Sequence, residues 1–124
     1  MAVTYNVRQA RGVTVVDLSG RITTLKDREA PGSVSLHDLV RDLAAQGAKN
    51  ILLNLRDIDY IDSSGIGELF ACFTTVRSHG GTLKLSHPTE RVRNLFRLTM
   101  LYTMIEVIED ESTAIQSFSV AAAS

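Results

Sequence analysis

The chain has 124 residues, 44% of them hydrophobic and 22% charged, which is the length and composition of one globular domain rather than of a disordered chain. Its formal net charge of −1 gives no basic field for direct binding of nucleic acid or of an anionic membrane surface. No apolar run reaches the ~18 residues that span a bilayer, and the single cysteine, Cys72, excludes an intrachain disulfide. We therefore expect one soluble, cytoplasmic domain over residues 1–124, with its core at about 3–118 and a frayed tail at 119–124.

Two strands begin the predicted fold. Apolar residues alternate over residues 3–9 and 13–19, and Arg11-Gly12 between them predicts an antiparallel hairpin. Residues 21–24 are expected to continue the second strand as a short bent strand. The segment Leu25–Val34 contains charges, a proline and a glycine, which indicates a surface loop.

Helices and strands are expected to alternate after this loop. The helices are predicted at about Ser35–Gln46, Ser63–His79 and Thr89–Leu98 and from Asp110 onward, and the strands at 50–55, 82–86 and 104–108. The helical segments carry apolar stripes, and the continuous apolar run at 50–55 is typical of a parallel strand covered on both faces. Right-handed crossovers then give parallel strands. The fold class is therefore α/β, a mixed sheet with an N-terminal antiparallel hairpin, parallel strands after it, and about four packed helices.

The most informative segment is the run DYIDSSGIGE, residues 59–68, which joins the apolar strand to the second helix. Functional sites in α/β proteins tend to lie at the carboxyl ends of parallel strands. Asp62 or Ser63 is predicted to cap the helix by accepting a hydrogen bond from a first-turn amide. This arrangement leaves the hydroxyl of Ser64 in the first turn, near solvent.

Two glycines, Gly65 and Gly67, fall at the start of this helix. Each costs about 1 kcal/mol relative to alanine in a helix interior, so one interpretation is that another molecule approaches the backbone closely here. The helix N-terminus also favours an anion, and a phosphate on Ser64 would add about −1.5 to −2 charge. The alternative is an ordinary cap with small residues for tight packing, and these residues alone do not decide between the two.

Several segments together resemble a STAS domain, and most of all the stand-alone bacterial anti-sigma factor antagonists, or anti-anti-sigma factors. The segments are Ile51–Leu55, the DSSGIG run at 62–67, Gly80-Gly81 and the helix at Arg91–Leu101. The resemblance extends from Val3 to Phe118, and the DSSGIG run is its specific part. It implies a STAS-like fold for the whole domain.

The resemblance also implies a function. The second serine of the run, Ser64, corresponds to the family's phosphorylation site. The unphosphorylated protein is implied to bind an anti-sigma factor, itself a serine kinase, and so to release a sigma factor. The kinase uses ATP to phosphorylate Ser64, which abolishes binding, and a serine phosphatase reverses the modification. We expect no catalytic residue, cofactor or metal, and a partner surface formed by Thr23, Asp62, Ser63, Ser64, Gly65, Ile66 and Gly67.

Two features depart from the family pattern. Many members carry an acidic residue shortly after the glycine that ends the second strand, in the pattern G-x-[IL]-D, and here that position is Thr23. The loop Leu25–Val34 is also longer than in compact members. Both departures bear on the identity of the partner rather than on the fold.

Two other functions stay open from the sequence. The first is a STAS scaffold or transporter-associated subunit that is never phosphorylated; a free-standing chain with both serines intact argues against it. The second is a serine-dependent enzyme, since Ser64 lies on a strand-to-helix turn. The nucleophile elbow G-x-S-x-G is absent, however, because Asp62 stands where its first glycine belongs. A base from His37, His79 or His87 is not excluded by sequence.

The remaining motifs are weaker. Asp57, Asp59 and Asp62 suggest a cation site, but Ile61 at the fifth position rules out an EF-hand loop, and a polar loop with a cap is favoured. The run Gly65-Ile66-Gly67 is too short for the G-x-G-x-x-G dinucleotide fingerprint. The arginines of residues 91–97 are interpreted as a solvated helix face, and Cys72 as a small buried hydrophobe.

Overall fold

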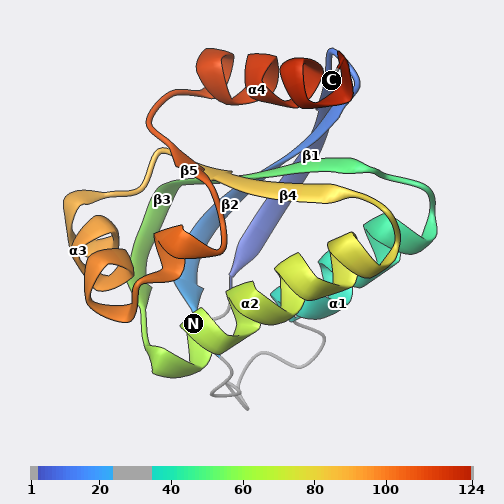
Figure 1. The fold of residues 1–124 in the computed structure, drawn as a ribbon. Helices are drawn as coiled ribbons and strands as arrows, with labels where there is room; N and C mark the ends of the chain where they lie inside the picture. The colour runs from blue at the N-terminus through green and yellow to red at the C-terminus, as the bar shows by residue number, and fades with distance from the viewer. Residues whose placement is uncertain (1–2, 24–34, 124) are drawn as a thin grey trace.

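The computed structural model describes residues 3–23 and 35–123 as a five-stranded sheet with helices on both faces (Figure 1). The strands are β1 (Thr4–Ala10), β2 (Val13–Ile22), β3 (Asn50–Ile61), β4 (Thr82–Ser86) and β5 (Val107–Ile108). The helices are α1 (Leu36–Ala45), α2 (Ser63–Ser78), α3 (Glu90–Thr99) and α4 (Glu111–Ala123), with a 3₁₀ turn, η1, at Leu101–Thr103. The loop expected at Leu25–Val34 lies outside the described residues.

The strands lie side by side in chain order, from β1 to β5. β1 pairs antiparallel with β2, and the three other pairs are parallel, which confirms the predicted mixed sheet. The hairpin turn is also confirmed: Arg11 and Gly12 have φ values of 52° and 81°. Two successive positive φ values match the right-handed twist of a two-residue hairpin.

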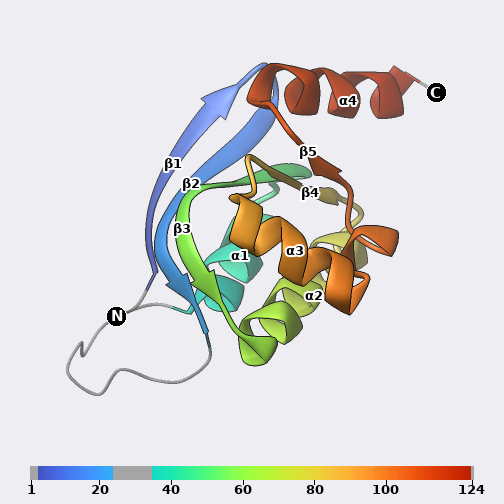
Figure 2. The ribbon, with the colours of Figure 1, turned by 90° about the vertical axis from the view of Figure 1, so that its left-hand side faces the viewer.

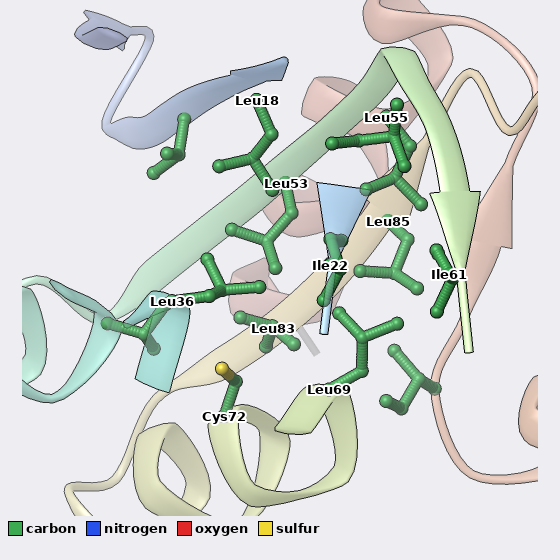
Figure 3. Close-up of a cluster of buried hydrophobic side chains, with 14 of the residues drawn as sticks. Leu18, Ile22, Leu36, Leu53, Leu55, Ile61, Leu69, Cys72, Leu83 and Leu85 are labelled. Carbon is green, nitrogen blue, oxygen red and sulfur yellow. The ribbon is translucent and has the colours of Figure 1, made fainter. Parts of the chain in front are cut away.

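The helices divide between the two faces of the sheet. α1, α2 and α3 cover one face, and α4 crosses the other (Figure 2). The larger core lies under the first three helices and contains Leu53 and Leu69 (Figure 3). The smaller core joins Leu52 to Phe118 of α4. Leu52 and Leu53 therefore point into opposite cores. This confirms the prediction that the apolar run at 50–55 is a strand covered on both faces.

β3 is twice as long as its apolar run predicts. The strand continues beyond Leu55 to Ile61, with Ile58 and Ile61 buried in the larger core and polar residues exposed between them. The paired strand β2 has register shifts between Asp17 and Ser19 and between Gly20 and Arg21, which let both strands reach Ile22 and Ile61 together. The extension carries the ends of β2 and β3 to the start of α2.

The C-terminal segment differs from expectation at two places. The last strand was predicted at 104–108, but the N–H of Ile105 donates to the carbonyl of Leu101, so the chain stays coiled until β5 begins at Val107. α4 continues to Ala123 and so includes residues 119–123, which the sequence analysis assigned to a frayed tail. The other predicted helices and the strand at 82–86 agree with the structure to within a residue at most ends.

α4 is fastened to the sheet by an ion-pair cluster as well as by the smaller core. The guanidinium of Arg8 on β1 pairs with Asp17 on β2 at 2.7 Å and also with Glu111 in the first turn of α4. Asn54 of β3 donates to the same Asp17 carboxylate at 2.8 Å. These contacts lower the pKa of both carboxyls, with the Arg8 hydrogen bond as the main cause. None of the described helices is both long and apolar enough to cross a membrane.

Candidate functional site

The candidate site lies where β3 passes into α2, beside the end of β2. Ile22 and Ile61 are partners in the parallel pairing of these strands, so the residues that follow them leave the sheet side by side. Figure 3 shows both isoleucines beside Leu69 of α2 in the larger core. The sheet thus places Thr23 next to Asp62, although 39 residues separate them in sequence.

Asp62 is the N-cap of α2. Its backbone is extended, with φ −103° and ψ −175°, and its Oδ1 atom accepts a hydrogen bond from the N–H of Gly65 at 2.8 Å. The carboxylate therefore satisfies one of the amides that have no partner within the helix. Of the two caps that the sequence allows, Asp62 or Ser63, the structure selects Asp62.

Two hydroxyl groups converge on the same carboxylate. Ser64 Oγ donates to Asp62 Oδ1 at 2.5 Å, and Thr23 Oγ1 donates to Asp62 Oδ2 at 2.7 Å. The two hydroxyl oxygens lie 3.2 Å apart. The side chains of Thr23, Asp62 and Ser64 therefore form one connected cluster at the N-terminus of α2.

The environment keeps Asp62 ionised. The hydrogen bond from Ser64 is the main cause that lowers its pKa, and those from Thr23 and the Gly65 amide act in the same direction while burial opposes them. A carboxylate whose pKa is lowered by the hydrogen bonds it accepts is a weak base. Asp62 is therefore suited to orienting the Ser64 hydroxyl rather than to removing its proton.

The two glycines of the motif have different surroundings. A Cβ on Gly65 would overlap the carbonyl oxygen of Ile22 and would lie 2.9 Å from Cγ2 of Ile61. A Cβ on Gly67 would meet no atom within 4 Å. For Gly65 the close approach predicted from sequence is made by the protein's own β2, whereas Gly67 leaves open space beside the helix.

The seven residues expected at the partner surface differ in exposure. Ser63 and Gly67 are exposed. Thr23, Asp62 and Ser64 are half-buried, and Gly65 and Ile66 are buried. Gly65 and Ile66 thus shape the surface from beneath and place no side chain on it.

The alternative chemistries can be compared with the same geometry. Within residues 3–23 and 35–123, no three histidine, cysteine or acidic side chains come together as a metal site, and Asp57 and Asp59 stand exposed on β3.

Each histidine ring bonds away from Ser64: His37 contacts Thr75, His79 contacts a backbone carbonyl, and His87 contacts Arg56. The described residues therefore pair no imidazole with the Ser64 hydroxyl.

Two weaker motifs also have a clear place. Cys72 is fully buried in the larger core, as expected of a small hydrophobe, and burial raises the pKa of its thiol. On α3, Arg91 and Arg97 are exposed and Arg93 pairs with Glu109 at 2.5 Å. These arginines belong to the surface face that the sequence analysis assigned to them.

The fold and this site agree with a known domain. The family model described as "STAS domain" matches residues 4–114, which is most of the chain. The chain belongs to the STAS family. The match includes β1 to β5 and the DSSGIG run, so the resemblance identified from sequence is confirmed.

Relatives of this STAS domain have been named in several bacteria. The chain is 31% identical over 116 residues to the anti-sigma-B factor antagonist of Bacillus subtilis, which covers 94% of this chain and all of that protein. The phosphorylated form of the Bacillus cell fate determinant SpoIIAA has the same fold, with a TM-score of 0.64 and 20% identity over 93% of this chain and 99% of that chain. A sulfate transporter family protein from Wolinella succinogenes also shares the fold, with a TM-score of 0.70 and 14% identity over 93% and 91% of the two chains.

Sequence reasoning found Ser64 and its neighbours but not the contacts that hold them. Thr23 was expected on the partner surface and noted as a departure from the family pattern, but its bond to Asp62 joins segments that are distant in sequence and was not predicted. The Ile22–Ile61 pairing that brings them together depends on the β2 register shifts, for which the sequence carries one signal, Gly20 within the strand.

Proposed function

We propose that this STAS protein is an anti-sigma factor antagonist: its unphosphorylated form binds an anti-sigma factor serine kinase and thereby releases a sigma factor. The kinase transfers a phosphoryl group from ATP to Ser64, which abolishes binding, and a serine phosphatase restores the binding form. In this proposal the protein is a non-catalytic regulator that acts in the cytoplasm, on proteins rather than on nucleic acid or membranes. The observation that carries the proposal is the Ser64 hydroxyl, held on Asp62 at the N-terminus of α2.

The position of Ser64 suits a phosphoacceptor. The residue is half-buried in the first turn of α2, where backbone amides and the helix dipole favour negative charge. A phosphoryl group at this point therefore gains local support from the helix, and we expect the domain to remain folded after phosphorylation.

The same position suits a switch in binding. Phosphorylation replaces a neutral hydroxyl by a group of about −1.5 to −2 charge, next to the Asp62 carboxylate that Ser64 contacts at 2.5 Å. A partner surface fitted to the hydroxyl would have to desolvate this charge without a cation to pair with it. Each 1.4 kcal/mol of such a penalty weakens binding about tenfold.

The relatives support the regulatory role. The Bacillus subtilis protein that matches along its whole length is an anti-sigma-B factor antagonist. Phosphorylation is part of the description of SpoIIAA, which shares the fold. We extend both properties to this chain because its DSSGIG run places Ser64 on an aspartate cap at a partly exposed helix end.

A second candidate function is a STAS scaffold or transporter-associated subunit that is not phosphorylated. It is favoured by the shared fold of the Wolinella succinogenes transporter protein, although one fold hosts many functions. Phosphorylation separates the two candidates, because a scaffold needs no phosphoacceptor. A serine-dependent enzyme is less favoured, since the three histidine rings bond elsewhere.

The proposal is tested by binding titrations against the cognate anti-sigma factor kinase, identified by pairwise binding among the anti-sigma factors of the source organism. Ser64→Ala is expected to bind at least as tightly as the wild type, and Ser64→Asp more than tenfold more weakly, with a near-native melting curve. Ser112→Asp is the matched control, because Ser112 occupies the same place in the first turn of α4 and is exposed. Equal binding by the Ser64→Asp and Ser112→Asp proteins contradicts the proposal.

A further inference from the structure

Thr23 ties the cap of α2 to the sheet. The two carboxylate oxygens of Asp62 accept hydrogen bonds from different parts of the fold. Oδ1 accepts from Ser64 and Gly65, which are both on α2, and Oδ2 accepts from Thr23, which follows β2. The carboxylate is therefore held between two elements of the fold. A rotation of the carboxylate about its own axis would break contacts on both sides.

The shortest contacts of the two hydroxyl groups lead to one acceptor. A hydroxyl group has one proton and two lone pairs, and the Ser64 and Thr23 hydroxyls lie 2.5 and 2.7 Å from the Asp62 carboxylate, which can only accept, but 3.2 Å from each other. With its proton on Oδ1, Ser64 directs its nucleophilic lone pairs away from the carboxylate. The orientation of the nucleophile is thus set by the orientation of Asp62.

We propose that Thr23 is a positioning residue for phosphoryl transfer to Ser64: by donating to Asp62 Oδ2, it fixes the carboxylate that aims the Ser64 hydroxyl. This inference rests on the proposed function of Ser64 as the phosphoacceptor. In that transfer the Ser64 Oγ–P bond forms as the bond between the γ-phosphorus of ATP and the ADP oxygen breaks, ADP leaves, and the Ser64 proton passes to a base of the kinase. Thr23 takes neither the phosphoryl group nor the proton. Its contribution is the restriction of the acceptor to one orientation, the kind of pre-organisation that raises the rate of a bound reaction.

Thr23 acts through its side-chain hydroxyl, which donates to Asp62, and not through the bulk of its side chain. Thr23→Val keeps the shape of the side chain and removes the donor, whereas Thr23→Ser keeps the donor and removes a methyl group. Thr113→Val is a matched control on α4, because Thr113 Oγ1 donates to the capping Asp110 at 2.8 Å in the same manner. This control removes the same kind of hydroxyl donor from an aspartate cap, but at a helix where we propose no phosphorylation.

The experiment measures steady-state phosphorylation of the full chain by the cognate kinase with ATP, together with melting temperature. For Thr23→Val we expect kcat to fall about tenfold or more, a larger factor than any change in KM, and the melting temperature to fall by no more than the loss of one hydrogen bond explains. Thr23→Ser should restore most of the rate, and Thr113→Val should leave it unchanged. A wild-type kcat in Thr23→Val, or an equal loss in Thr23→Ser, overturns the inference.

A second measurement needs no kinase. The Hα–Hβ couplings of Ser64 in NMR spectra report its χ1 populations, and we expect a single rotamer in the wild type and Thr23→Ser but averaging in Thr23→Val. A single rotamer in all three overturns the positioning role. If the wild-type protein accepts no phosphate, the proposed function fails, and the couplings still decide whether Thr23 orients Ser64.

Discussion

Two helices of this protein begin with the same local chemistry and differ in what surrounds it. Asp62 precedes α2 and Asp110 precedes α4, and each carboxylate accepts a hydrogen bond from the backbone N–H three residues later, at 2.8 and 2.9 Å. Each also accepts one from a nearby side-chain hydroxyl, and each has a lowered pKa. Two residues after each aspartate stands a serine, Ser64 or Ser112.

The difference lies in the long-range contacts. Asp62 also accepts a hydrogen bond from Thr23, which follows β2, and the residue three after Asp62 is a glycine packed against the carbonyl of Ile22. Among the described residues, the Asp110 carboxylate accepts hydrogen bonds from Thr113 alone, and Thr113 is exposed. Both helices therefore begin with an aspartate cap and a serine, and the hydrogen bond to Thr23 beside the sheet is what distinguishes the α2 end, the site of our proposal.

The largest expected effect concerns Gly65. Gly65→Val should lower the free energy of unfolding by about 3 kcal/mol or more, because its Cβ overlaps the Ile22 carbonyl and a backbone group cannot move away cheaply. Gly67→Ala is the matched control; with no atom within 4 Å of its Cβ, it should be neutral or stabilising by up to about 1 kcal/mol. Urea denaturation of both proteins measures the difference, and similar values for the two would refute the packing role of Gly65.

The second effect concerns the caps themselves. Asp62→Ala should lower the free energy of unfolding by about 1–2 kcal/mol, because it removes the acceptor for the Gly65 amide and for the hydroxyls of Ser64 and Thr23. Asp110→Ala removes an exposed cap whose carboxylate is hydrogen-bonded by Thr113, and it should lower the free energy of unfolding less. Parallel denaturation curves give both numbers, and a greater loss in Asp110→Ala would show that the long-range contact to Thr23 adds nothing.

The smallest effect is the acid dependence of the α2 cap. The folded-state pKa of Asp62 is lowered from its ordinary value of 3.8, so its stabilisation is fully present above that pH and is lost as the pH falls through the lowered folded-state pKa. In Asp62→Asn this part of the acid destabilisation should be missing. The stability difference between wild type and variant, measured from about pH 5 to about pH 2, should therefore shrink toward low pH; a constant difference is the contrary result.

The sequence was most informative where local chemistry decides the structure. The helix starts near Ser35 and Thr89, the Arg11-Gly12 hairpin and the apolar stripes each depend on a few neighbouring residues, and the structure contains them all. The extension of β3 to Ile61 was missed because exposed polar residues interrupt its apolar pattern. That extension is also what carries Asp62 to Thr23, so the contact between them was beyond the reach of a local pattern.

The two glycines illustrate the same limit at the site. From sequence, Gly65 and Gly67 have equal standing as poor helix formers in a first turn. Only the packing of α2 on β2 shows that a side chain is excluded at Gly65 and not at Gly67. The motif thus drew attention to this segment, while the reason for its two glycines lies in the tertiary structure.

The most direct test of the account is to incubate the full chain with its cognate anti-sigma factor kinase and ATP, and to map the phosphate by tandem mass spectrometry. The peptides that carry Ser63 and Ser64 and the peptide that carries Ser112 are read in the same run, so the α4 serine serves as an internal control. We expect phosphate on Ser64, none on Ser63 or Ser112, and none anywhere in the Ser64→Ala protein. Phosphate on Ser63 or Ser112, or undiminished phosphorylation of Ser64→Ala, would contradict it.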